Sequence, residues 1–195
     1  MMLSVEDKRW LLDLARRTVL FYLSEDKVPL LADLDLVKRG HLTDPSRVFV
    51  TLKKKGGLRG CMGSIYSKLP LIEGVIQQAV HAAFNDPRFS SVSLDEWDDI
   101  LFEISVLSFP EPVDSWKDIC VGKHGVIFEK RGCSAVFLPK VAVEWGWGVE
   151  EMLTQLARKA GLGGDDWGEG GAFLSHTPAN PRRARRARRL RRGRL

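Results

Sequence analysis

The sequence is poor in cysteine and has no long apolar segment, and both absences narrow the class of protein. Its three cysteines, Cys61, Cys120 and Cys133, are an odd number and form no C-x-x-C pair. This disfavours a disulfide framework and a structural zinc site, which needs four clustered ligands. No apolar run approaches the roughly 20 residues that span a bilayer, and the N-terminus lacks a signal-peptide pattern. We therefore expect a reducing, cytoplasmic location without membrane association.

The common nucleotide, metal and hydrolase motifs are also missing. There is no P-loop, no H-E-x-x-H and no G-x-S-x-G, and GLGG at 161–164 follows a predicted helix instead of opening one. The four histidines, His41, His81, His124 and His176, are far apart in the chain. The sequence therefore predicts no metal site and no bound cofactor.

Acidic residues are absent from the end of the chain, and this explains the net charge of +5. Residues 176–195 contain nine arginines, whereas residues 1–175 contain 21 basic and 25 acidic residues. The body is thus mildly acidic and is no basic nucleic-acid-binding fold. We predict one domain over 1–175 and a disordered basic tail over 176–195, because an arginine-covered helix would repel itself.

What is present is typical of a soluble globular domain. Hydrophobic residues make up 44% of the 195 residues and charged residues 28%, which is enough for a sizeable core. Apolar spacing predicts helices over 5–23, 70–86 and 149–160, hairpins over 47–66 and 125–138, and a strand over 100–109. Helices and hairpins are mixed without strict alternation. The predicted class is therefore α+β, with a largely antiparallel sheet flanked by helices.

The segment LRGCMG holds the candidate nucleophile. On a strand, Arg59 and Cys61 point to the same face, roughly 6.5–7 Å apart, and a cation beside a thiol favours the reactive thiolate. Gly60 and Gly63 would let a ligand or another backbone approach closely. The alternative is a buried structural cysteine, with Arg59 in solvent or paired to an acid.

Two further segments hold charged residues with open roles. Asp86 and Arg88 flank Pro87, either as a local ion pair at a helix end or to present Arg88 to an anionic ligand. Glu103 shares a predicted strand face with apolar residues, so it must be paired or protonated. Arg59 or Arg88 would serve as its partner, in a structural ion pair or in one wall of a site.

His124 lies in a glycine-flanked turn, GKHG. It is either a general base near Cys61 or an exposed turn residue. His81 falls nearly opposite the apolar stripe of its predicted helix, so we expect it at the surface.

Five segments in this order resemble the AMMECR domain family: LRGCMG (58–63), FNDPRF (84–89), EISVLS (103–108), GKHG (122–125) and FLPKVAVEWGW (137–147). The resemblance runs from about residue 5 to 167. It implies two unequal lobes and a cleft lined by the family's shared residues, which here would be Arg59, Cys61, Asp86, Arg88, Glu103 and His124. The family's activity is not established. Its prokaryotic members often occur beside, or fused to, a Memo-type protein and a radical SAM protein, which implies both as partners.

The end of the chain departs from the family pattern. Members usually continue past the position of Trp167 with an apolar strand, whereas this chain continues with GEGGAFLSHTPANP and then the arginine run. A shifted reading frame, a sequence artefact or a genuine basic extension would each explain the departure. A genuine tail would bind nucleic acid non-specifically, with strong salt dependence.

Three functions follow from these residues. The first is an enzyme or accessory subunit in which Cys61 is the nucleophile, His124 the base, and Arg59 with Arg88 the anion clamp. The second is a non-catalytic interaction module that docks a Memo-type or radical SAM protein. The third is nucleic-acid binding through the tail alone.

Overall fold

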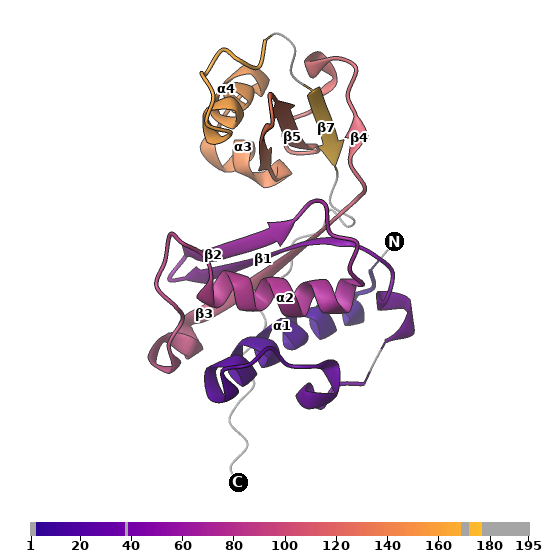
Figure 1. Cartoon of the computed structure of the whole chain (residues 1–195), viewed down its shortest axis with the longest axis vertical. Helices are drawn as coiled ribbons and strands as arrows, with labels where there is room; N and C mark the ends of the chain where they lie inside the picture. The colour runs from indigo at the N-terminus through magenta and orange to yellow at the C-terminus, as the bar shows by residue number, and fades with distance from the viewer. Residues whose placement is uncertain (1–2, 38, 169–171, 177–195) are drawn as a thin grey trace. The chain divides into compact units, whose positions relative to one another are not determined.

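The computed structural model describes residues 3–37, 39–168 and 172–176, which divide into two compact units (Figure 1). Unit 1 lies within Met1–Val106 and unit 2 within Leu107–Ala179. Each unit combines helices with a small sheet that contains antiparallel pairs. The predicted α+β class is therefore confirmed.

Unit 1 contains the first predicted helix, the first hairpin, the second helix and the long strand. Its described elements are α1 (Val5–Glu25), η1 (Leu31–Leu34), η2 (Gly40–Leu42), β1 (Arg47–Lys54), β2 (Gly57–Ser64), α2 (Leu71–Phe84), η3 (Leu94–Asp99) and β3 (Ile100–Leu107). The strand over 100–109 is thus two residues shorter than predicted.

Helix α1 begins at a capping box. The Asp7 amide donates to Ser4 Oγ at 3.0 Å, and Asp7 Oδ2 accepts from the Ser4 amide at 2.9 Å. These bonds satisfy donors that a helix start leaves without partners. Arg39 and His41 also contact the Asp7 carboxylate. Burial alone would raise the pKa of Asp7, but the bonds from Ser4 and His41 lower it overall.

The sheet of unit 1 has the strand order β2-β1-β3, and α2 packs along it (Figure 1). Alternate residues of β1, Val48, Val50 and Leu52, are buried. Their period of two gives β1 one apolar face. In α2, Leu71 and Val75 are fully buried, as the predicted wide apolar stripe requires.

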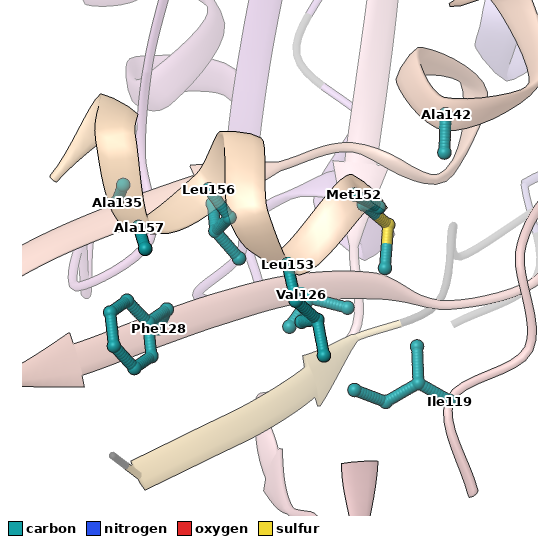
Figure 2. Close-up of a cluster of buried hydrophobic side chains, with 9 residues drawn as sticks. All are labelled: Ile119, Val126, Phe128, Ala135, Ala142, Met152, Leu153, Leu156 and Ala157. Atoms are coloured by element: carbon teal, nitrogen blue, oxygen red, sulfur yellow. The ribbon is translucent and has the colours of Figure 1, made fainter. Parts of the chain in front are cut away.

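Unit 2 contains the second hairpin and the last predicted helix. Its described elements are β4 (Glu111–Pro112), η4 (Trp116–Asp118), β5 (Gly125–Lys130), β6 (Cys133–Phe137), α3 (Pro139–Trp145), α4 (Val149–Lys159) and β7 (Ala172–His176). The strand order is β4-β7-β5-β6. Leu153 and Leu156 of α4 point toward Val126 and Phe128 of β5, and all four are fully buried (Figure 2).

Strand β7 corrects an expectation about the C-terminal segment. We expected the family's apolar strand to be replaced after Trp167, yet Ala172–His176 pairs with β5 in antiparallel register, with Gly125 opposite His176. Strand β7 also includes His176, the first residue of the predicted tail. The prediction of a disordered basic tail otherwise falls on residues 177–195, outside the described residues.

The described residues contain no helix long and apolar enough to cross a membrane. The structure defines each unit separately, so the cleft between two unequal lobes stays a prediction.

Candidate functional site

Cys61 lies on β2, at one edge of the unit 1 sheet, and is half-buried. It pairs with Thr51 across the ladder, and the Thr51 hydroxyl lies 3.3 Å from Cys61 Sγ. The thiol is free of any disulfide. The sheet therefore holds Cys61 in a fixed direction with a reduced side chain.

The space beside the two glycines near Cys61, Gly60 and Gly63, is filled by other atoms of the protein. A Cβ on Gly60 would lie 2.0 Å from the carbonyl oxygen of Ala82, so only glycine lets α2 approach β2 this closely. A Cβ on Gly63 would lie 2.2 Å from the ring of Phe49. Of the two predicted roles, close approach of another backbone is thus confirmed at Gly60.

Asp86 and Arg88 follow the end of α2 and form hydrogen bonds to the backbone of β2. Asp86 Oδ2 accepts from the backbone amide of Cys61 at 2.8 Å and from Arg88 Nη2 at 2.7 Å. Asp86 Oδ1 accepts from Arg88 Nε at 2.9 Å. Arg88 Nη2 also donates to the Cys61 carbonyl at 3.2 Å. The local Asp–Arg pair is confirmed, and it is anchored to the backbone of the candidate nucleophile.

This pairing fixes both charges. The hydrogen bond from Arg88 lowers the pKa of Asp86 to about 2, although burial opposes it. The same bond raises the pKa of Arg88, with a further contribution from the nearby Cys61 sulfur. Asp86 is 4% exposed, whereas the Arg88 side chain is 55% exposed. One end of the pair is thus buried and the other can meet a ligand.

Arg59 pairs with Glu96 of η3. Arg59 Nη2 lies 2.6 Å from Glu96 Oε1 and Arg59 Nε 3.1 Å from Glu96 Oε2, while Lys54 Nζ donates to Oε2 at 2.7 Å. These bonds, led by that from Arg59, lower the pKa of Glu96 to about 2. Arg59 Nη1 is buried and has no hydrogen-bond partner in the described part of the chain.

A bulge explains why Arg59 turns to Glu96. The ladder pairs Leu52 with Gly60 and Lys53 with Leu58, which leaves Arg59 as the extra residue. Bulges redirect a side chain, so strict alternation no longer fixes its direction. Arg88, and not Arg59, is therefore the arginine whose guanidinium contacts Cys61, at the carbonyl oxygen. The sequence motifs did not point to Glu96, for which the only signal was an S-x-x-E capping pattern that begins at Ser93.

Glu103 corrects another expectation. Its carboxylate lies 2.9 Å from Lys53 Nζ, and its side chain is 36% exposed. We expected Arg59 or Arg88 as its partner, but these two guanidinium groups are held by the carboxylates of Glu96 and Asp86. The expectation that Glu103 must be paired is confirmed, with Lys53 as the partner.

His124 belongs to unit 2, whereas Cys61 belongs to unit 1. The His124 ring closes its own turn, where Nδ1 accepts from the Cys120 amide at 3.2 Å. With Nδ1 as acceptor, the proton of the neutral ring is on Nε2. The ring is half-buried. The predicted role of His124 as a base for Cys61 stays a prediction, as does the joint cleft.

His176 is an ionisable residue that sequence reasoning assigned to the tail. It is 2% exposed, and both ring nitrogens are buried without a partner in the described residues. Its ring occupies the space beside Gly125, where a Cβ would lie 1.9 Å from His176 Cε1. Burial lowers the pKa of His176 to about 4. No sequence signal distinguishes it from a surface histidine.

Metal-ligating side chains do not gather in the part of the chain that is described. It contains no group of three or more His, Cys, Asp or Glu residues placed to hold an ion.

Comparison with known sequences decides the family. The sequence model of AMMECR1 matches residues 12–175. The chain belongs to the AMMECR1 family. This confirms the resemblance carried by the five segments, and β7 falls almost wholly within the matched range.

The chain is also similar in sequence and structure to archaeal proteins of this family. A protein of Methanothermobacter thermautotrophicus is 50% identical over 121 residues, covering 59% of this chain and 63% of that protein. The chain thus matches less than two thirds of that relative's length. Protein PYRAB00100 of Pyrococcus abyssi is 39% identical over 178 residues, covering 85% of each chain. The crystal structure of uncharacterized protein PH0010 from Pyrococcus horikoshii superposes with a TM-score of 0.82 at 36% identity, over 90% of each chain.

Proposed function

We propose that this AMMECR1-family chain acts in a cysteine-dependent reaction on an anionic substrate, as an enzyme or an accessory subunit. Cys61 would be the nucleophile and Arg88 the group that binds the anion. The observation that supports this proposal is the contact between the two residues: Arg88 Nη2 donates to the Cys61 carbonyl, and the thiol is free.

The chemistry follows from the charges of this cluster. A guanidinium near a thiol favours the thiolate, which is the form that attacks an electrophilic carbon. As the C–S bond forms, an electron pair moves from that carbon to an attached oxygen, and Arg88 would stabilise the charge. Asp86 holds Arg88 through Nε and Nη2, which leaves Nη1 for a substrate. The thiol proton would pass to solvent water before the attack.

Alkylation of the native chain by iodoacetamide tests the nucleophile. We expect Cys61 to react faster near neutral pH than Cys133, which is also half-buried. Arg88→Gln should slow Cys61 about tenfold, or by about 1.4 kcal/mol, because it removes a cation near the sulfur. Peptide mass spectrometry resolves the three cysteines. If Cys61 reacted no faster than Cys133, the nucleophile role would be lost.

A non-catalytic interaction module is the second candidate. The observation that favours it is the full engagement of Asp86 and Glu96 in bonds that tie elements of unit 1 together. In that case the family's shared residues serve the fold, and the surface serves a Memo-type or radical SAM partner. Size-exclusion chromatography of the full chain with each protein tests this candidate. A stable complex that Cys61→Ser leaves intact would support the module.

A further inference from the structure

A groove in unit 1 lies apart from the Cys61 cluster. It has a volume of about 330 Å³. Its lining comes from α1, from η1 and from the residue that follows η1: Arg17, Leu20, Phe21, Ser24, Asp33, Leu34 and Asp35. Leu20, Phe21 and Leu34 supply an apolar surface, and Leu20 is 44% exposed. An apolar side chain of a partner would therefore remove further surface from water in this groove.

The polar lining of the groove is negative. The Arg17 guanidinium is already paired, with Nε 3.0 Å from Asp13 Oδ2 and Nη1 donating to the Leu34 carbonyl at 3.3 Å. Asp33 and Asp35 are both exposed. One Asp33 oxygen accepts from the Leu30 amide, which leaves the carboxylate its charge.

The segment around the groove is likewise acidic and has exposed apolar side chains. Residues 20–37 contain four acidic residues and one basic residue, Lys27. Lys27 Nζ lies 5.4 Å from the ring centroid of Phe21, so a cation already lies over the aromatic lining. Close by in sequence, Val28, Leu30 and Val37 are exposed to 54%, 72% and 85%. Exposed apolar side chains with an excess of one charge are typical of an interaction surface.

We propose that this groove docks a basic amphipathic segment of a partner protein. An apolar side chain of that segment enters the groove lined by Leu20 and Phe21, and its lysines or arginines pair with Asp33 and Asp35. The charge of the rim selects this occupant, because an acidic segment would place like charges together. The apolar lining selects an amphipathic segment over a merely basic one.

The test uses the full chain and a fluorescein-labelled peptide with leucine and lysine at helical amphipathic spacing. The matched peptide carries glutamate in place of lysine. Fluorescence anisotropy should show binding of the lysine peptide, and Asp33→Asn with Asp35→Asn should raise its Kd about fivefold, as two lost surface ion pairs imply. Both changes suit the fold, because Asn keeps an oxygen acceptor for the Leu30 amide and tolerates the left-handed backbone of Asp35, whose φ is 50°.

Two controls separate docking from general charge attraction. Glu73→Gln with Asp95→Asn removes two exposed carboxylates of unit 1 outside the groove, and it should leave Kd unchanged. Leu20→Ser should weaken binding without any charge change. Absent binding of the lysine peptide, equal losses in both double variants, or full affinity in Leu20→Ser would each overturn the proposal.

Discussion

Asp86 of unit 1 and His176 of unit 2 are both buried ionisable side chains, and the two units accommodate them in opposite ways. Asp86 is ionised and accepts four hydrogen bonds, from the Cys61 amide, the Arg88 amide and the Arg88 guanidinium. His176 is buried as deeply, yet its ring nitrogens have no partner in the described residues. A carboxylate at neutral pH must be paired to be buried, whereas an imidazole can shed its proton.

This difference reflects two roles: the Asp86 carboxylate connects two elements, whereas the His176 ring fills space in the core. The Asp86 carboxylate joins the end of α2 to β2, so it shapes the surroundings of Cys61. The His176 ring fills the space that Gly125 leaves open. Both pKa values are displaced, but of these two groups only Asp86 adjoins the candidate nucleophile, Cys61. A displaced pKa by itself is therefore weak evidence for function.

The largest expected effect comes from Asp86. Asp86→Ala leaves the Cys61 amide, the Arg88 amide and the Arg88 guanidinium without their acceptor, and each buried donor left in this way costs about 1–3 kcal/mol. Asp86→Asn keeps one acceptor oxygen and should cost less. Urea unfolding gives the free energies, and hydrogen exchange of the Cys61 amide locates the loss. A cost for Asp86→Ala below that of Asp86→Asn would contradict the connecting role.

The pH dependence of stability should identify His176. Its folded pKa of about 4 lies below the ordinary value of 6.5, so the unfolded state takes up the proton first. Stability is therefore full above pH 6.5 and falls as the pH drops toward 4, by about 3 kcal/mol in all. Asp86, with a folded pKa of about 2 against 3.8, loses its contribution only below about pH 4.

His176→Phe supplies the control for this window. The variant keeps an aromatic ring beside Gly125 and removes the proton uptake, so its stability should change less between pH 6.5 and 4 than that of the parent chain. Urea midpoints of both proteins at several pH values give the difference. Parallel curves would show that His176 is not held neutral in the folded state.

Local signals account for what the sequence predicted well. The helix predicted over 5–23 begins where Ser4 and Asp7 form a capping box within one turn, so a local signal marks the start of α1. Asp86 and Arg88 lie two residues apart, so their pair could also be predicted. Strand β7 was missed because AFLSH is short and follows a glycine-rich stretch that carries no apolar alternation.

Contacts between distant segments account for the errors. The ion pair of Arg59 and Glu96 joins residues 37 positions apart in the chain. It also depends on a bulge in β2, and no residue pattern in the sequence predicts that bulge. Glu103 was given the wrong partner for the same reason, since the neighbour across the sheet decides it. The burial of His176 depends on its register with Gly125. Such contacts are set by the tertiary structure, so the sequence pattern alone does not predict them.

The smallest expected effect comes from alanine at Gly60 and at Gly125, two of the glycines that have a close neighbour. An alanine at Gly60 would meet the Ala82 carbonyl, which is backbone, so α2 or β2 must move. An alanine at Gly125 would meet the His176 ring, which can rotate about its own side-chain bonds. Overpacking costs about 1–3 kcal/mol, and we expect Gly60→Ala near the upper end and Gly125→Ala near the lower. Urea unfolding measures both, and His176→Ala in the Gly125→Ala background should remove the second cost. If Gly125→Ala were the more costly change, the His176 ring would be a rigid part of the core, and the contrast between the two units would weaken.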